Sequence, residues 1–376
     1  MSAHPSSDPI LVTREDQLRE LVEVLRPQSH VASDTESNSL HVYQERVCLI
    51  QFSIPGQDYL VDPLANPDLE PLAPIFADPE IEMIFHAAEY DAGCLRRDFG
   101  FQIANLFDTR IAARLLGRTQ TGLGYLLREE FGVRLNKRFQ RANWGKRPLS
   151  PELLSYASLD SHYLLPLRHR LASALHEAGR WLEAQEACTY IARTSTHNKV
   201  FDPERYWRIP NVRRLKPVER SVLRELFLYR EEKARNLDRP SFMVVDDKTL
   251  ITIARARPKN LEALRTLEGM TPGRVKRFGK QLLTSVARGE QTPPPKPPKR
   301  IRADVAVLAR FERLRHWRKR MAISRQIESD LVIPREVLWQ IASQAPQDMQ
   351  ALEPIMGVLR WRFEAYGPQI LEYTKH

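Results

Sequence analysis

The first half of the chain alternates short apolar runs with longer amphipathic patterns. Apolar runs bounded by polar residues predict strands over Ile10–Val12, His30–Thr35, Arg46–Ile54, Asp58–Val61 and Ile81–His86. Helical periodicity begins near Arg14, Asp68, Glu89, Asp108, Thr121 and Pro151. Strands that alternate with helices are typical of an α/β sheet domain, which we expect over residues 1–195.

The second half repeats itself at an offset of 88 residues. Leu250 matches Leu338, Gly269 matches Gly357 and Gly279 matches Gly367 in one ungapped register. Each copy begins with an amphipathic run and continues with three further helical patterns, which predicts two all-α helical bundles over residues 208–290 and 301–376. Between them, the prolines of Gln291–Arg300 forbid helix and favour an extended spacer, so we expect a linker at 291–300.

Length and composition fit a soluble, multidomain protein. The 376 residues exceed what one hydrophobic core usually holds, and 42% hydrophobic with 28% charged residues excludes wholesale disorder. No run of 18 apolar residues predicts a membrane span, and the first residues lack the pattern of a secretory signal, so we expect a cytoplasmic protein. Three cysteines without a C-x-x-C pair argue against disulfides or a thiolate zinc site.

Charge divides the chain into an acidic and a basic half. Residues 1–200 hold 21 Lys and Arg against 26 Asp and Glu, whereas residues 201–376 hold 36 against 21. Basic side chains that neutralise phosphates release counterions, so the second half suggests a polyanionic partner. A solvated, charged helical surface explains the same numbers, and charge alone leaves both interpretations open.

Four acids and one tyrosine follow the predicted elements of the first domain. Asp34 and Glu36 alternate at the end of one strand and share a face, and Asp91 falls in the first turn of a later helix. Tyr156 and Asp160 lie one turn apart on the helix that starts at Pro151. Each pattern alone is common, but their order within one α/β domain predicts a single acidic site.

This series resembles the three exonuclease motifs of the DEDDy 3′–5′ exonucleases, which have a ribonuclease H-like fold. The resemblance extends to the bacterial ribonuclease D family through flanking segments such as Leu49-Ile50-Gln51 and Asn143-Trp144. The two helical copies look like its paired helicase-and-RNase-D C-terminal (HRDC) domains. One departure is Ser37-Asn38 after the first motif, where many members carry a bulky group.

The resemblance implies a metal-dependent hydrolysis of phosphodiesters. Asp34, Glu36, Asp91 and Asp160 would hold two divalent metal ions, Mg²⁺ or Mn²⁺, and Tyr156 would orient the attacking water. General chemistry agrees, because crowded carboxylates need cations to stay ionised and oxygen ligands favour these hard metals.

Basic residues near the third motif are candidate RNA contacts. The segment Arg134–Arg147 interleaves six basic residues with Phe139 and Trp144, a mixture that suits single-stranded RNA. The predicted RNA-binding residues are Arg138, Arg141, Lys146 and Arg147 there, and Arg274, Lys276 and Arg277 in the first helical copy. The alternatives are a loop anchored by a buried Trp144, and helical copies that only brace the α/β domain. His86 is either an acid or metal ligand, or a packed strand-end residue.

We therefore expect a monomeric 3′–5′ exoribonuclease that releases nucleoside monophosphates from RNA, with tRNA precursors and other structured RNA 3′ ends as substrates. Two alternatives remain. A DNA 3′–5′ exonuclease could use the same acids, and a non-catalytic RNA-binding protein would require a broken acidic site.

Overall fold

The computed structural model describes residues 8–65, 68–136, 138–197, 200–298 and 304–375. The chain divides into two compact units. One unit combines the α/β domain with the second helical copy, and the other combines the first helical copy with residues 38–46. Within the described ranges, no helix has both the length and the apolar character that crossing a bilayer requires.

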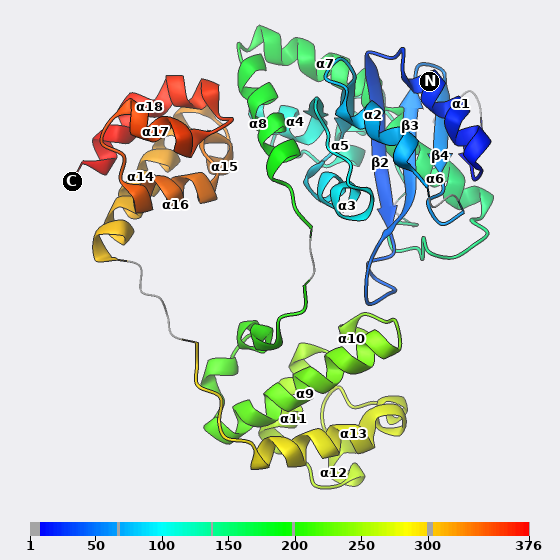
Figure 1. The fold of residues 1–376 in the computed structure, drawn as a ribbon, viewed down its shortest axis with the longest axis vertical. Coiled ribbons are helices and arrows are strands. Elements are labelled where there is room, and N and C mark those ends of the chain that lie inside the picture. Colours follow the sequence, from blue (N-terminus) through cyan, green and yellow to red (C-terminus); the bar gives the residue numbers. More distant parts are fainter. Residues whose placement is uncertain (1–7, 66–67, 137, 198–199, 299–303, 376) are drawn as a thin grey trace. The chain divides into compact units, whose positions relative to one another are not determined.

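A six-stranded mixed sheet in the order β1-β4-β3-β2-β5-β6 forms the centre of the α/β domain (Figure 1). The strands are β1 (Ile10–Val12), β2 (His30–Ser37), β3 (Val47–Ile54), β4 (Gln57–Val61), β5 (Glu82–Phe85) and β6 (Leu106–Asp108). The central strand β2 pairs antiparallel with β3 and parallel with β5. The five strands predicted from the sequence are present, and β6 was not predicted.

Helices surround this sheet. They are α1 (Glu15–Leu25), the 3₁₀ turn η1 (Glu70–Leu72), α2 (Ala73–Ala77), α3 (Glu89–Phe99), α4 (Thr109–Leu115), α5 (Leu123–Phe131), α6 (Pro151–His162), α7 (Leu164–Glu177) and α8 (Trp181–Thr194). Helix α6 packs against β2, β3 and β4, and α8 packs against β6. The start of α6 is set by Ser150, whose hydroxyl accepts from the Leu153 N–H, and by Pro151 in the first turn.

The two helical copies have matching elements. The first contains η2 (Pro203–Arg208), η3 (Val212–Arg214), α9 (Pro217–Asn236), α10 (Ser241–Val244), α11 (Asp247–Ala256), α12 (Leu261–Arg265) and α13 (Pro272–Gln291). The second contains α14 (Val305–Arg325), α15 (Ser329–Val332), α16 (Arg335–Gln344), α17 (Met349–Met356) and α18 (Arg360–Thr374). Residues 292–298 form neither helix nor strand, and the last two residues of the predicted linker lie outside the described ranges.

Individual contacts recur at the same offset of 88 residues. Arg230 donates to the Val245 carbonyl at 3.2 Å, and Arg318 donates to the Ile333 carbonyl at 2.9 Å. The left-handed residue that ends α11, Arg257, is matched by Ala345 after α16, with φ of 47° and 48°. The duplication found in the sequence is therefore a duplication of tertiary structure. The short helices α10 and α15 were missed, because four residues show no helical period.

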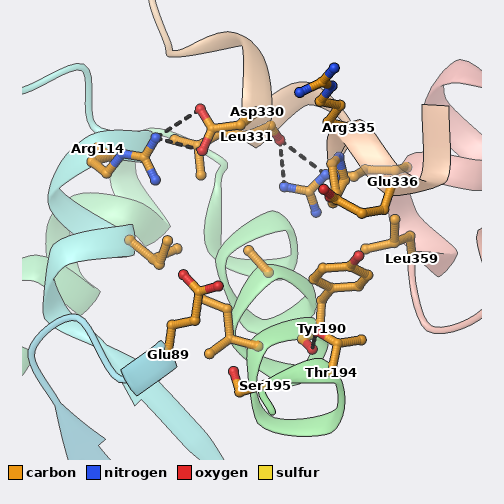
Figure 2. A pocket seen from close by; sticks show the side chains of 15 residues that line it. Glu89, Arg114, Tyr190, Thr194, Ser195, Asp330, Leu331, Arg335, Glu336 and Leu359 are labelled. Carbon is orange, nitrogen blue, oxygen red and sulfur yellow. Dashed lines mark hydrogen bonds and ion pairs between the residues drawn. The ribbon is translucent and has the colours of Figure 1, made fainter. Parts of the chain in front are cut away.

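A cavity of about 340 Å³ lies where the second copy packs on the α/β domain (Figure 2). Glu89 of α3 and Tyr190 of α8 line one side, and Arg335 of α16 lines the other. Arg114 of α4 and Asp330 of α15 bridge the two sides with an ion pair of 2.7 Å. The second copy is thus attached to the α/β domain by charged as well as apolar contacts.

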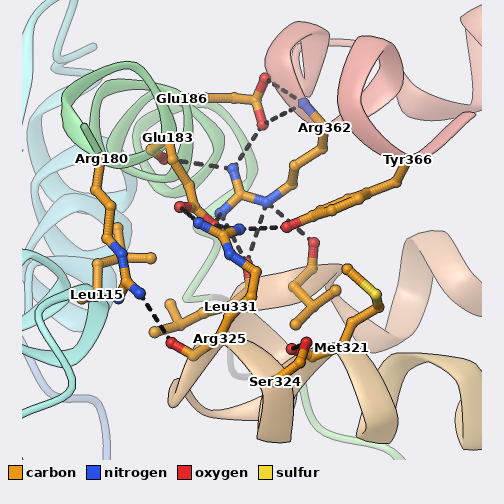
Figure 3. A network of polar contacts seen from close by, with 11 residues as sticks. Leu115, Arg180, Glu183, Glu186, Met321, Ser324, Arg325, Leu331, Arg362 and Tyr366 are labelled. Carbon is orange, nitrogen blue, oxygen red and sulfur yellow. Dashed lines mark hydrogen bonds and ion pairs between the residues drawn. The ribbon is translucent and has the colours of Figure 1, made fainter. Parts of the chain in front are cut away.

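Buried ion pairs continue this interface along α8 (Figure 3). Arg362, only 2% exposed, places its guanidinium 2.5 Å from Glu186 and also donates to the Leu331 carbonyl at 2.7 Å. Arg325 donates to both carboxylate oxygens of Glu183, at 2.7 and 2.6 Å. Burial raises the pKa of Glu186 even though Arg362 opposes this shift, so removal from water outweighs the attraction of the pair. The network joins α8 to the second copy through directional contacts.

The duplicated arginine has a different partner in the first copy. Arg274, which corresponds to Arg362, is ion-paired with Asp246 at 3.1 Å and donates to the Gly269 carbonyl at 2.8 Å. The residue that corresponds to Asp246 in the second copy is Pro334. Because proline cannot pair with a cation, Arg362 is left to the carboxylates of α8.

We predict that Arg362→Met lowers the free energy of unfolding of the first unit by about 3–5 kcal/mol, because it leaves Glu186 buried without its cation. Urea denaturation measures this loss. The double variant Arg362→Met/Glu186→Leu should regain most of it, since neither charge is then buried alone. Arg360→Met, two residues earlier and exposed, should change stability by less than about 0.5 kcal/mol. Equal losses in the single and double variants would contradict the coupling.

Candidate active site

Strand β2 carries Asp34 and Glu36 at its carboxyl end. Both side chains are partly exposed, whereas Val31, Ala32 and Ser33 before them are buried. Burial raises the pKa of Asp34 well above its ordinary value, and the negative charges of nearby carboxylates raise it further. Burial raises the pKa of Glu36 in the same way. The end of the central strand is therefore a place where negative charge is costly.

Helix α3 brings Asp91 to the same place. Its carboxylate accepts a hydrogen bond from the Thr35 hydroxyl, between the two acids of β2. Burial raises the pKa of Asp91 to about 7, although this hydrogen bond opposes the shift. The start of α3 is held by Asp108, which accepts from the Ala87 and Ala88 N–H groups at 3.0 and 2.8 Å. Thr35 and Asp108 thus position the site, and neither was predicted from the sequence.

Helix α6 contributes Tyr156 and Asp160 from one face. Tyr156 hydrogen-bonds to Asp160, and its ring lies 5.8 Å from Phe139 and 6.1 Å from Trp144. Burial raises the pKa of Asp160 to about 7. Burial and the neighbouring carboxylates raise the pKa of Tyr156 as well, so its phenol stays protonated and is available as a hydrogen-bond donor.

The four carboxylates form one electrostatic group. The charges of Asp91, Asp160 and Glu36 all raise the pKa of Asp34, so the structure brings together acids from β2, α3 and α6. Oxygen donors of this kind suit Mg²⁺ or Mn²⁺. Within the described ranges, however, no three His, Cys, Asp or Glu residues stand close enough to enclose an ion. The ligand assignment therefore stays a prediction.

The basic segment before α6 is held mainly by Arg147 and Trp144. Arg147 donates to Asp62 at 2.6 Å, to the Cys48 carbonyl at 2.8 Å and to the Trp144 carbonyl at 2.7 Å. Trp144 is 1% exposed and packs in the small cluster that also contains Leu49. Arg147 therefore braces the loop, and Trp144 is the buried anchor that was the alternative interpretation.

The other predicted RNA contacts differ in their surroundings. Arg138 lies over the Phe139 ring at 5.4 Å, and Lys146 is exposed. Arg141 is exposed too. In the first helical copy Lys276 and Arg277 are exposed on α13, whereas Arg274 is ion-paired. Direct RNA contact thus stays a prediction for all of them, and Arg147 and Arg274 already hydrogen-bond to protein groups.

Two residues near the motifs have structural contacts of their own. His86 lies 2.9 Å from the Thr109 hydroxyl, and burial lowers its pKa to about 4, so it is neutral and packed. Ser37, at the departure from the family pattern, places its hydroxyl 3.0 Å from the Tyr90 hydroxyl.

None of the five motif residues lines the cavity of Figure 2, which is therefore separate from the acidic site.

Two family models match the chain. The model described as 3′-5′ exonuclease matches residues 9–176, which include all five motif residues. The HRDC domain model matches twice, over residues 219–286 and 307–373. These matches coincide with the α/β domain and with the two helical copies.

Curated relatives identify the family. Ribonuclease D of Cronobacter turicensis is 32% identical over 282 residues, which cover 74% of this chain and 76% of that protein. The chain belongs to the ribonuclease D family. Eukaryotic relatives are longer: Protein RRP6-like 3 of Arabidopsis thaliana is 41% identical over 177 residues, and mouse Exosome complex component 10 is 33% identical over 266. The chain covers only 20% and 30% of these two relatives.

Solved structures of this family have the same architecture. Escherichia coli RNase D matches with a TM-score of 0.69 and 27% identity over 98% of both chains. The catalytic core of Trypanosoma brucei RRP6 matches with a TM-score of 0.68 and 29% identity, covering 77% of this chain and 82% of that core. The predicted fold class, an exonuclease domain followed by two HRDC helical domains, is confirmed.

We predict that divalent metal binding releases protons near neutral pH. Asp91 and Asp160 have pKa values of about 7 in the metal-free fold, compared with about 3.9 in an unfolded chain. Between these values the folded state binds more protons, so the stability of the metal-free protein should fall as pH rises from about 4 to 7. A bound cation favours the ionised carboxylates and should reverse this trend.

Titration calorimetry with Mn²⁺ in buffers of different ionisation enthalpy at pH 6.5 measures the released protons. Asp160→Asn should release fewer protons than the parent protein. Glu80→Gln, which alters an exposed acid just before β5, should release the same number of protons as the parent protein. Proton release that is independent of Asp160 would contradict the assignment.

Proposed function

We propose that this chain is a metal-dependent 3′–5′ exoribonuclease. The observation that carries the proposal is the electrostatic coupling of Asp34, Glu36, Asp91 and Asp160 beside Tyr156, within a domain that matches the 3′-5′ exonuclease family. The chain hydrolyses phosphodiesters from the 3′ end of RNA and releases nucleoside monophosphates. A DNA exonuclease is the second candidate, because the same acids can act on either sugar.

The four carboxylates would hold two divalent ions, Mg²⁺ or Mn²⁺. When bound, such ions activate water and stabilise the leaving oxygen of an in-line displacement. Tyr156 supplies a protonated phenol that orients the attacking water, and its ring is kept in place by Phe139 and Trp144. Thr35 fixes the Asp91 carboxylate by donating to it.

The substrates we propose are structured RNAs, tRNA precursors among them. The similar Escherichia coli RNase D is an exoribonuclease involved in structured RNA processing. In this chain the excess of positive charge is concentrated in the first helical copy, since residues 201–300 hold 24 Lys and Arg against 12 Asp and Glu. A basic surface of this kind attracts RNA phosphates. We further propose that the protein acts as a monomer in the cytoplasm.

We predict that Asp34→Asn and Asp160→Asn each lower RNA hydrolysis by at least about 10³-fold, because each removes a charge from the reacting centre. Tyr156→Phe should lower kcat less, since only the hydroxyl is lost. The assay uses 5′-labelled RNA with Mg²⁺ or Mn²⁺, and RNA binding is measured separately with Ca²⁺. Full activity in either Asn variant would overturn the assigned site.

The choice of nucleic acid separates the candidate functions. Matched linear RNA, linear DNA, circular RNA and RNA with a 3′ phosphate are incubated with the parent protein. We expect mononucleotide release from linear RNA alone. Efficient cutting of circular RNA would indicate an endonuclease, and faster digestion of DNA would favour the second candidate.

We predict that Lys276→Ala/Arg277→Ala weakens binding to long structured RNA without slowing hydrolysis of a short oligonucleotide. The slope of log affinity against log salt should flatten by roughly 0.7 for each phosphate contact removed. Lys248→Ala is the matched control, because Lys248 is also exposed in this copy but is paired with Glu268 at 2.6 Å. Identical salt slopes in all three proteins would exclude α13 from the RNA surface.

A further inference from the structure

A buried side-chain amide without hydrogen bonds lies on β3, the strand next to the acids of β2. Gln51 of β3 is fully buried, and neither its side-chain nitrogen nor its side-chain oxygen has a hydrogen-bond partner among the described residues. A buried carboxamide can make several hydrogen bonds, and leaving them unmade costs about 1–3 kcal/mol. Gln51 is therefore not explained by the stability of the fold.

The register of the sheet places this amide next to Asp34. Gln51 and Asp34 are direct partners in the antiparallel β2–β3 ladder, so their side chains share one face of the sheet. Directly opposite side chains in such a pair have Cβ atoms about 4.5–5.5 Å apart. A glutamine side chain spans this separation, directly or through one water.

Two serines on the α6 side of the sheet already have partners. Ser53, two residues along β3, pairs with Ser161 of α6 at 2.8 Å. Ser158 of α6 donates to the Ser155 carbonyl at 3.0 Å. On the β4 side Gln51 faces the apolar Leu60. Asp58 of β4, whose Oδ1 is also buried without a partner, lies opposite Ser53 and only diagonally from Gln51. The carboxylate of Asp34 is the polar group that lies directly opposite Gln51 in the sheet.

We propose that Gln51 is a positioning residue for the metal-binding carboxylates. With the metal ions bound, its amide N–H donates to the ionised carboxylate of Asp34, a hydrogen bond that the metal-free structure lacks, and its carbonyl oxygen accepts from a water at the site. This inference rests on the proposed function. Gln51 would orient the carboxylate of Asp34 from the neighbouring strand. Thr35 has a similar relation to Asp91, because its hydroxyl donates to that carboxylate. Residues that hydrogen-bond to metal ligands typically change metal affinity or activity by about 10–100-fold when they are removed.

The test replaces Gln51 by residues of similar size that cannot form hydrogen bonds. Gln51→Leu and Gln51→Met remove an unpaired polar group, so Tm should be unchanged or higher. Mn²⁺ affinity, measured by calorimetry or electron paramagnetic resonance, should fall by about 10–100-fold. RNA affinity in Ca²⁺ should change little, kcat at fixed Mg²⁺ should fall, and excess Mg²⁺ should restore much of the rate.

Ser33→Ala is the matched control. Ser33 is also fully buried with an unpaired hydroxyl, and it adjoins Asp34 on β2, but its side chain lies on the opposite face of the sheet. This variant should keep the parent Mn²⁺ affinity. Unchanged Mn²⁺ affinity in both Gln51 variants, or a lower Tm with unchanged affinity, would overturn the positioning role. A parent protein that binds no Mn²⁺ would instead overturn the proposed function.

Discussion

Repulsion among four carboxylates is the constraint on which the structure of the catalytic domain depends. Asp34 and Glu36 come from β2, Asp91 from α3 and Asp160 from α6, and the charges of Asp91 and Asp160 raise the pKa of both acids of β2. Burial adds to this cost, because the charged form is disfavoured away from water. A site of this kind does not assemble by attraction between its own members. The surrounding elements must hold it together, and their contacts show how.

Each of these elements is fixed by contacts behind the acids. Asp108 holds the start of α3 through backbone N–H groups, and Ser150 caps α6. The loop before α6 is tied to the sheet by Arg147, which reaches Asp62 and the Cys48 carbonyl. These hydrogen bonds are made by residues that carry no chemistry of their own. They oppose the separation that electrostatic repulsion favours.

One arginine position of the duplicated helical domain has different partners in the two copies. Arg274 and Arg362 occupy the same position in the two copies, but Asp246 binds the first and the carboxylates of α8 bind the second. The second copy therefore belongs to the same compact unit as the exonuclease domain, whereas the first keeps exposed cations on α13. The two copies thus differ at the position of one local acid, which is Asp246 in the first and Pro334 in the second.

The sequence by itself determined most of the elements and the duplication, and it predicted the set of motif residues. Short apolar runs mark the strands, Pro151 after Ser150 marks the start of α6, and the offset of 88 residues marks the duplication, because these patterns are local or strictly periodic. Tertiary structure decided which residues contact or adjoin the motif residues. Thr35, Asp108 and Gln51 have ordinary local patterns, and their relation to the acids comes from strand register and helix packing. Glu186, Asp62 and the Cys48 carbonyl, which bind Arg362 and Arg147, are distant from them in sequence, so no local pattern distinguishes these bridging arginines from arginines that only face solvent.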